Sequence, residues 1–68
     1  NLHLLGLNQR QIKAIFYIKE KGKVTNRDYQ ALNEIGRETA TRDLKELIEK
    51  EILKPSGRKG AGAFYTLR

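Results

Sequence analysis

The sequence predicts an α+β domain of three helices followed by a small antiparallel β-hairpin. Two stretches open with polar residues spaced as in a helix capping box, and a third, residues 36–50, repeats its apolar residues at the 3.6-residue period of an amphipathic helix. After residue 51 that period disappears, and two short runs of strand-favouring residues flank a glycine-rich segment. At 68 residues, the chain has enough apolar surface for one small core.

The composition argues against several classes of protein. A domain of this size buries only about 60% of the surface that its unfolded chain exposes, so few apolar residues are left to enclose a deep active site. The chain has no cysteine and a single histidine, His3, so we expect neither disulfides nor a metal site. No set of residues is spaced like a catalytic triad or a pair of buried carboxylates. We therefore expect this domain not to be an enzyme, with no catalytic residue and no cofactor.

Positive charge is concentrated at the two ends of the chain. Of the net charge of +6, residues 1–24 and 52–68 contribute +4 each, whereas residues 25–36 and 37–51 contribute −1 each. This distribution suits an anionic partner, above all nucleic acid. Hydrophobic residues make up 38% of the chain without forming a run of about 18, so we expect no membrane contact and a cytoplasmic location.

The first helix is expected to begin after Asn8, which can form a capping box with Gln11, and to end at Gly22. Leu7, just before the cap, can pack against the first turn. The residues expected to face the core from this helix are Ile12, Ile15 and Phe16, with Ile18 at the edge of the stripe.

A second, shorter helix is expected from about residue 26 to residue 32. Val24 precedes it in an extended link that can pair as one rung of a sheet, and Thr25 with Asp28 repeats the capping-box spacing. Residues 33–36 then form a tight turn. A short helix, a tight turn and a longer amphipathic helix together predict a helix-turn-helix.

The helix expected over residues 36–50 has two unlike faces. One stripe is apolar and should pack on the core, whereas the opposite arc is polar and free to bind a partner. The stripe contains Ala40, Leu44, Leu47 and Ile48, and the arc contains Glu38, Thr41, Arg42 and Lys45. Asp43, Glu46 and Glu49, spaced three apart, are expected to lie on a solvated face.

The C-terminal part is expected to form a β-hairpin. Residues 52–54 are typical of a strand that Pro55 ends, and residues 63–67 are typical of a second. The segment SGRKGAG between them carries Arg58 and Lys59. It is not a nucleotide-binding loop, because it lacks the GK[ST] ending and does not open a helix.

The order of these elements is that of a winged helix, and three runs carry a family resemblance. LNQRQIKAIFYIKEKGKVTNRDYQ, GRETATRDLKELIEKEIL and GAGAFY resemble the winged helix-turn-helix domain at the C-terminal end of prokaryotic Fic-family proteins and of RecG-helicase-related, ATP-binding transcriptional regulators. The resemblance covers residues 7–67. We therefore expect a flexible lead-in over residues 1–6 and a domain over residues 7–68, excised from the C-terminal end of a larger protein.

The resemblance implies double-stranded DNA as the partner, with the helix over residues 36–50 in the major groove and the hairpin wing on the backbone or an adjacent groove. The major groove is about 12 Å wide and accepts one helix, and hydroxyls and amides at a helix start are good phosphate ligands. Arg42 can take guanine O6 and N7 together. The residues expected to contact DNA are Arg37, Thr39, Thr41, Arg42 and Lys45 on the helix and Arg58 and Lys59 on the wing.

Besides the alternative that Arg58 and Lys59 only keep an exposed hairpin edge soluble, three alternatives stay open. Arg42 can instead pair with Glu38 and Glu46 in a salt-bridge ladder. The net charge of −1 over residues 37–51 favours a protein-interaction module, which would form a homodimer or bind another domain of the parent chain. Glu38 also favours it, because the resembled family commonly has a neutral or basic residue there and a carboxylate repels phosphate. The third alternative is an RNA-binding winged helix that relies on the wing.

The sequence also predicts where the aromatic side chains lie and how the chain leaves the helix over residues 36–50. The aromatic residues Phe16, Tyr29 and Phe64 lie on the apolar faces of their elements, so we expect them in the core and not stacked on bases. Glu51 stands where the resembled family usually has glycine at a helix C-terminus, so we expect either a strained backbone at Glu51 or a helix that ends differently.

Overall fold

Side-chain caps decide where the first helix begins. In the computed structural model, which describes residues 6–57 and 63–68, α1 (Gln9–Lys21) starts at a capping box. Gln11 N donates to Asn8 Oδ1 over 2.8 Å, and Asn8 N donates to Gln11 Oε1 over 2.9 Å. Gly22 ends the helix in the left-handed conformation, with φ of 95°. Both predicted ends of this helix are confirmed.

The second capping box is also formed. Asp28 N donates to Thr25 Oγ1 over 2.9 Å at the start of α2 (Asn26–Asn33). The turn that follows contains Ile35, which is half-buried against the core, and α3 (Arg37–Glu49) begins after Gly36 without a side-chain cap. The predicted succession of short helix, tight turn and longer helix is therefore present.

The chain leaves α3 through a strained residue. Glu51 has φ of 61°, a left-handed conformation that residues with a Cβ seldom adopt. Of the two outcomes that the family resemblance implied, the structure therefore has the strained backbone. Glu51 N donates to the Ile48 carbonyl over 2.9 Å, and Ile52 N donates to the Leu47 carbonyl over 3.0 Å. These bonds hold the strained turn, which directs the chain from α3 into the hairpin.

Replacing Glu51 with glycine is expected to raise the free energy of unfolding by about 0.5–1 kcal/mol. Left-handed backbone costs a residue with a Cβ about 1–2 kcal/mol, and the greater flexibility of glycine in the unfolded chain offsets part of that gain. Thermal unfolding followed by circular dichroism measures the change. Lys50→Gly is the matched control, because Lys50 has φ of −83° and offers no strain to relieve. Equal gains from the two substitutions would contradict the prediction.

The hairpin pairs β1 (Leu53–Pro55) with β2 (Tyr65–Leu67) in antiparallel register, with Leu53 opposite Leu67. Val24 adds the predicted rung: its N–H donates to the Tyr65 carbonyl over 2.9 Å, and Tyr65 N–H donates to the Val24 carbonyl over 2.8 Å. Pro55 is the last residue of β1, as expected, and lies opposite Tyr65. It is tolerated there because both backbone groups of Tyr65 face Val24, so no N–H is required from Pro55.

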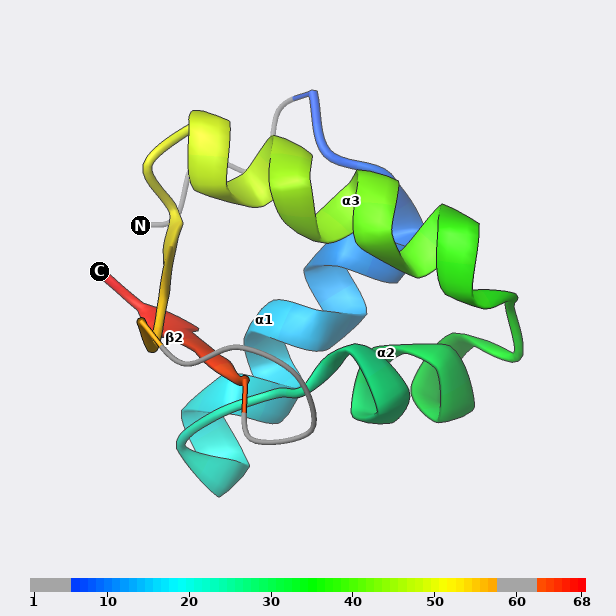
Figure 1. Ribbon diagram of the computed structural model, residues 1–68, viewed down its shortest axis with the longest axis horizontal. Helices are drawn as coiled ribbons and strands as arrows, with labels where there is room; N and C mark the ends of the chain where they lie inside the picture. Colours follow the sequence, from blue (N-terminus) through cyan, green and yellow to red (C-terminus); the bar gives the residue numbers. More distant parts are fainter. Residues whose placement is uncertain (1–5, 58–62) are drawn as a thin grey trace.

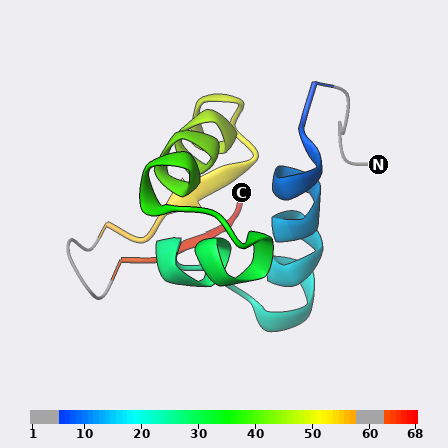
Figure 2. The ribbon, with the colours of Figure 1, turned by 90° about the vertical axis from the view of Figure 1, so that its right-hand side faces the viewer.

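The three helices and the hairpin surround one core. Figure 1 shows the N-terminal part of α3 beside α2, and the hairpin following the C-terminal end of α3. Figure 2 shows α1 on one side of α2 and α3. This is the predicted α+β class, with three helices followed by a small antiparallel hairpin and a winged-helix-like topology. The buried apolar residues are Ala14, Ile15, Ile18, Val24, Tyr29, Ala40, Leu44, Leu47 and Leu53.

Two of the three aromatic residues predicted for the core lie elsewhere. Tyr29 is fully buried, as expected, but Phe16 is 57% exposed. On α1 the buried positions are 11, 14, 15 and 18, so the helix is rotated by about one residue from the predicted stripe. Phe64 is half-buried outside the core cluster, with Lys23 Nζ 4.8 Å from its ring centroid. A cation–π contact at the edge of the hairpin therefore replaces the expected core packing of Phe64.

Two segments named in the sequence analysis fall outside the described residues. They are residues 1–5 of the expected lead-in and the loop positions 58–62 with Arg58 and Lys59. In the part of the chain that the structure describes, no helix is long and apolar enough to cross a membrane.

Candidate nucleic-acid interface

α3 presents the two faces that the sequence predicts. Ala40, Leu44 and Leu47 are buried in the core, and Ile48 is half-buried against it. The opposite side is open to solvent. Of the residues expected to contact DNA, Arg37, Thr41, Arg42 and Lys45 are exposed and Thr39 is half-buried, whereas Arg58 and Lys59 lie outside the described residues.

The start of α2 reaches the exposed side of α3, a contact that the sequence pattern does not predict. Asn26 Nδ2 donates to Thr41 Oγ1 over 3.0 Å, and Gln30 Nε2 donates to Asn26 Oδ1 over 2.5 Å. Because Thr41 Oγ1 accepts this bond, its own hydrogen is left to donate to another acceptor. Asn26 is thus a further candidate interface residue. The only signal in the sequence for Asn26 is its position directly after the Thr25 cap, as the first residue of the first helix of the helix-turn-helix.

The salt-bridge ladder considered for Arg42 is not formed. Glu46 accepts a bond from Gln11 Nε2 over 3.0 Å and pairs with Lys50 Nζ at 3.9 Å. Neither Glu38 nor Glu46 pairs with Arg42, and Arg42 makes no ion pair with any residue that the structure describes. The guanidinium is therefore left free on the outer arc of α3.

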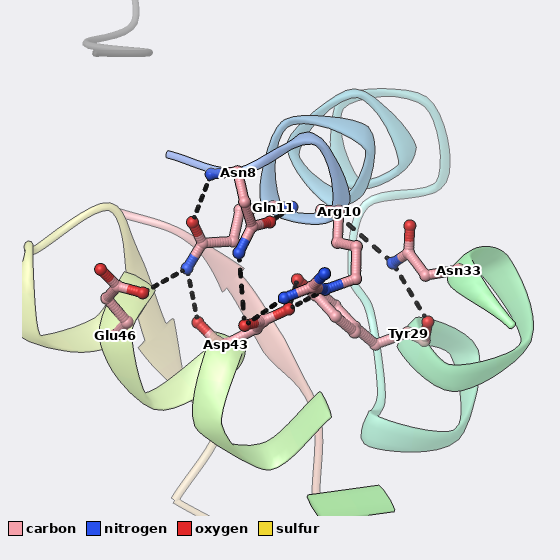
Figure 3. A network of polar contacts seen from close by, with 7 residues as sticks. All are labelled: Asn8, Arg10, Gln11, Tyr29, Asn33, Asp43 and Glu46. Atoms are coloured by element: carbon pink, nitrogen blue, oxygen red, sulfur yellow. Dashed lines mark hydrogen bonds and ion pairs between the residues drawn. The ribbon is translucent and has the colours of Figure 1, made fainter. Parts of the chain in front are cut away.

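Asp43 occupies a buried position, so its assignment to a solvated face was wrong. It is 3% exposed and lies at the centre of the polar network in Figure 3. Its carboxylate accepts from Arg10 Nε at 2.7 Å and Tyr29 Oη at 2.8 Å, and more weakly from Asn8 Nδ2 at 3.4 Å. Gln11 Nε2 donates to the Asp43 carbonyl over 3.2 Å. The network therefore joins α3 to both other helices.

This network sets the rotation of α3 about its axis. Asp43 lies beside Arg42 in sequence but points inward, where Arg10 of α1 and Tyr29 of α2 hold it. Among the described residues, every buried side-chain nitrogen and oxygen has a hydrogen-bond partner. Turning α3 by one residue would bury a cation of the outer arc and leave these polar groups without partners, so the buried network keeps Arg42 and Lys45 facing outward.

The network also changes the ionisation of its members. Burial acts to raise the pKa of Asp43, but hydrogen bonds from Arg10 and Tyr29 outweigh it and hold that pKa below the usual 3.8. Burial, together with the hydrogen bond to Asp43, raises the pKa of Tyr29 well above its ordinary value of 10.0. The hydrogen bond to Asp43 likewise raises the pKa of Arg10. The folded state therefore favours a charged carboxylate beside a neutral phenol.

Tyr29 is expected to make the domain less stable at high pH. Because the folded pKa lies above the unfolded value of 10.0, the contribution of the neutral phenol is complete below about pH 9 and is lost as the pH rises through and beyond 10. Urea unfolding at pH 8 to 11 measures this loss. Tyr29→Phe lacks the ionisable group and should show a smaller decline over the same range. Parallel declines of the two proteins would exclude Tyr29 as the cause.

Within residues 6–57 and 63–68, no three His, Cys, Asp or Glu side chains cluster so as to hold a metal ion. What the surface offers is a helix whose exposed side carries hydroxyl donors and free cations.

No family model matches this chain, and no curated protein matches it at a significant level. The resemblance to winged helix-turn-helix domains therefore rests on the runs of residues quoted above and on the winged-helix-like topology.

Proposed function

We propose that this chain is a double-stranded DNA-binding module that places α3 in the major groove and its hairpin against the backbone or an adjacent groove. The observation that carries the proposal is that two cations on α3 are exposed and make no ion pair with any described residue. Arg42 and Lys45 are exposed, with no ion-pair partner among the described residues, although α3 also carries several carboxylates. Exposed cations on one helix face can donate hydrogen bonds to phosphate oxygens and to the acceptor atoms of guanine edges.

The carboxylates of α3 are arranged so that they interfere little with this role. Asp43 is buried with Arg10, and Glu46 is engaged by Gln11 and Lys50. Glu38 and Glu49 remain exposed on the helix. Glu38 in the first turn weakens phosphate binding there unless it accepts a bond from cytosine N4. We therefore expect modest affinity, with little sequence discrimination from one copy of the domain.

The start of α2 adds a polar group next to the same surface. Asn26 orients the Thr41 hydroxyl as a donor, and Arg27 beside it is exposed. In a helix-turn-helix the first helix crosses the DNA backbone while the second enters the groove. A duplex lying along α3 would therefore meet the Asn26 end of α2 with its phosphates.

The family resemblance supports a wider proposal about the parent protein. It points to a larger transcriptional regulator or helicase-related ATP-binding protein, or to a Fic-family protein. In such a protein this domain would deliver a catalytic domain to DNA and perform no chemistry itself.

An NMR titration of the ¹⁵N-labelled domain with a random duplex of about 20 base pairs, two turns of DNA, tests the proposal. We expect a Kd of about 10⁻⁴ to 10⁻⁶ M near physiological salt, with shifts centred on Asn26, Thr41, Arg42 and Lys45. If Arg37, Arg42 and Lys45 each meet one phosphate, log K should fall against log salt with a slope of about −3. An absence of shifts at low salt would rule out DNA binding and would favour the alternative that the domain is a protein-interaction module.

A further inference from the structure

A shallow groove on the outer side of α1 takes no part in the proposed DNA contact. Its volume is about 370 Å³, and it lies between α1 and the C-terminal end of α2. No residue of α3 lines it. The residues that line it are Gln9, Arg10, Ile12, Lys13 and Phe16 of α1 and Asn33 of α2.

The floor of the groove is apolar and exposed. Within residues 6–57 and 63–68, Phe16 is the one large apolar side chain that is exposed, at 57%. Ile12 lies one helical turn before it and is half-buried, so the two form a continuous apolar strip along α1. Burying apolar surface is favourable, so this strip favours an apolar occupant.

The wall of the groove is built by Asn33. Its Nδ2 donates to the Tyr29 carbonyl over 3.2 Å within α2 and to the Arg10 carbonyl of α1 at 3.5 Å. Asn33 thereby holds the end of α2 against α1 (Figure 3). The groove is thus formed by two joined helices and does not depend on a movable loop.

The rim of the groove is basic. Arg10 and Lys13 line it, and Lys19 Nζ lies 5.9 Å from the Phe16 ring centroid. No carboxylate lines the groove. Asp43 engages Arg10, whose side chain is still 39% exposed, and Lys13 has no ion-pair partner among the described residues. An occupant that complements this rim is negatively charged.

We propose that the groove binds an acidic amphipathic segment of a partner protein, most simply a helix. Its apolar side chains would cover Phe16 and Ile12, and its carboxylates would meet Lys13 and the exposed part of Arg10. An amphipathic helix laid in a groove uses apolar anchors one turn apart, which is the spacing of this strip. A second copy of this chain is disfavoured, because two surfaces with the same cations, on chains of net charge +6, repel each other.

Single-stranded nucleic acid is also anionic, but it fits the groove less well. Proteins that bind single strands stack successive bases on several aromatic side chains. The groove has one aromatic ring, and the Lys19 ammonium lies over it. Ile12 beside that ring offers an aliphatic surface, which suits a leucine side chain better than a base.

Titration of the ¹⁵N-labelled domain with a synthetic helical peptide of glutamate and leucine, its leucines on one face, tests the proposal. We expect shifts at Ile12, Lys13, Phe16 and Asn33 with a Kd of about 10–100 μM, as befits a small transient contact. The matched peptide has lysine in place of glutamate, and an oligothymidylate serves as the nucleic-acid probe. The proposal is overturned if the glutamate peptide produces no shifts, or if either other probe binds this groove more tightly.

Two variants sharpen the test. Phe16→Ser should raise the Kd for the glutamate peptide at least tenfold. The fold and duplex binding should be unchanged, because Phe16 is exposed and no residue of α3 lines the groove. Lys13→Glu should reverse the preference, so that the lysine peptide binds better than the glutamate peptide. Lys21→Glu, at the exposed end of α1, is the control and should keep the wild-type preference. Self-association that Phe16→Ser abolishes would assign the groove to a second copy and refute the proposal.

Discussion

Replacing Asp43 with alanine is expected to lower the free energy of unfolding by about 3 kcal/mol. The substitution removes a hydrogen bond from Tyr29, which contributes about 1.5–3 kcal/mol when the acceptor is charged, and leaves the fully buried Tyr29 hydroxyl without a partner, which costs about 1–3 kcal/mol. The side chain of Arg10 is 39% exposed, so water screens its share of the loss. A domain of 68 residues has a total stability of about 3–10 kcal/mol, so this variant loses a large part of it.

Three further variants separate the parts of the Asp43 network. Tyr29→Phe removes one hydroxyl and should cost about 1–1.5 kcal/mol. Arg10→Ala should be milder than Asp43→Ala, because Tyr29 and Asn8 still donate to the carboxylate. Glu49→Ala is the control on the same helix, because Glu49 is exposed and has no partner among the described residues. Its free energy of unfolding should lie within about 0.5 kcal/mol of that of the parent domain. Urea unfolding curves give all four values. If Asp43→Ala and Glu49→Ala cost the same, the buried network does not hold α3.

Reversing the charges of Arg42 and Lys45 together, Arg42→Glu with Lys45→Glu, is expected to weaken duplex binding by about 100-fold or more near 50 mM salt. Each cation lost removes a phosphate or base contact, and each glutamate gained repels the backbone. Both side chains are exposed and make no ion pair among the described residues, so the fold should be retained. Fluorescence anisotropy of a labelled duplex measures the affinity, and circular dichroism checks the fold.

The matched control for this double variant carries the same change of net charge on another helix. Lys13 and Lys21 are both exposed on α1, and replacing both with glutamate should weaken duplex binding only a few-fold through the long-range field. Equal losses from the two double variants would show that binding follows net charge and not a surface on α3. A parent domain with no duplex affinity at low salt would instead favour the protein-interaction alternative.

Local signals in the sequence predict the ends of the helices and the faces of α3. Asn8 with Gln11 and Thr25 with Asp28 are capping pairs within one turn, so their bonds form wherever the chain is helical. These features depend on contacts across a few positions, which a single sequence displays.

The rotation of α1 could not be predicted in the same way. An apolar stripe through Ile12, Ile15 and Phe16 and one through Ala14, Ile15 and Ile18 have centres about one residue apart around the helix, and hydrophobicity favours the first. The structure takes the second, because Gln11 is needed inside to bond Asp43 and Glu46, 32 and 35 positions away. Phe16 is consequently turned out to solvent, where it forms the floor of the α1 groove.

The sequence by itself determined the α+β class, the order of the elements and the polar arc of α3, because periodicity and capping are local properties of the chain. The tertiary structure alone decided that Asp43 is buried, that Asn26 reaches Thr41, that Arg42 has no ion-pair partner among the described residues and that Phe16 is exposed. The physical reason is that a polar side chain is buried only where partners satisfy it. The partners of Asp43, Arg10 and Tyr29, stand 33 and 14 positions away and meet it only once the three helices have packed.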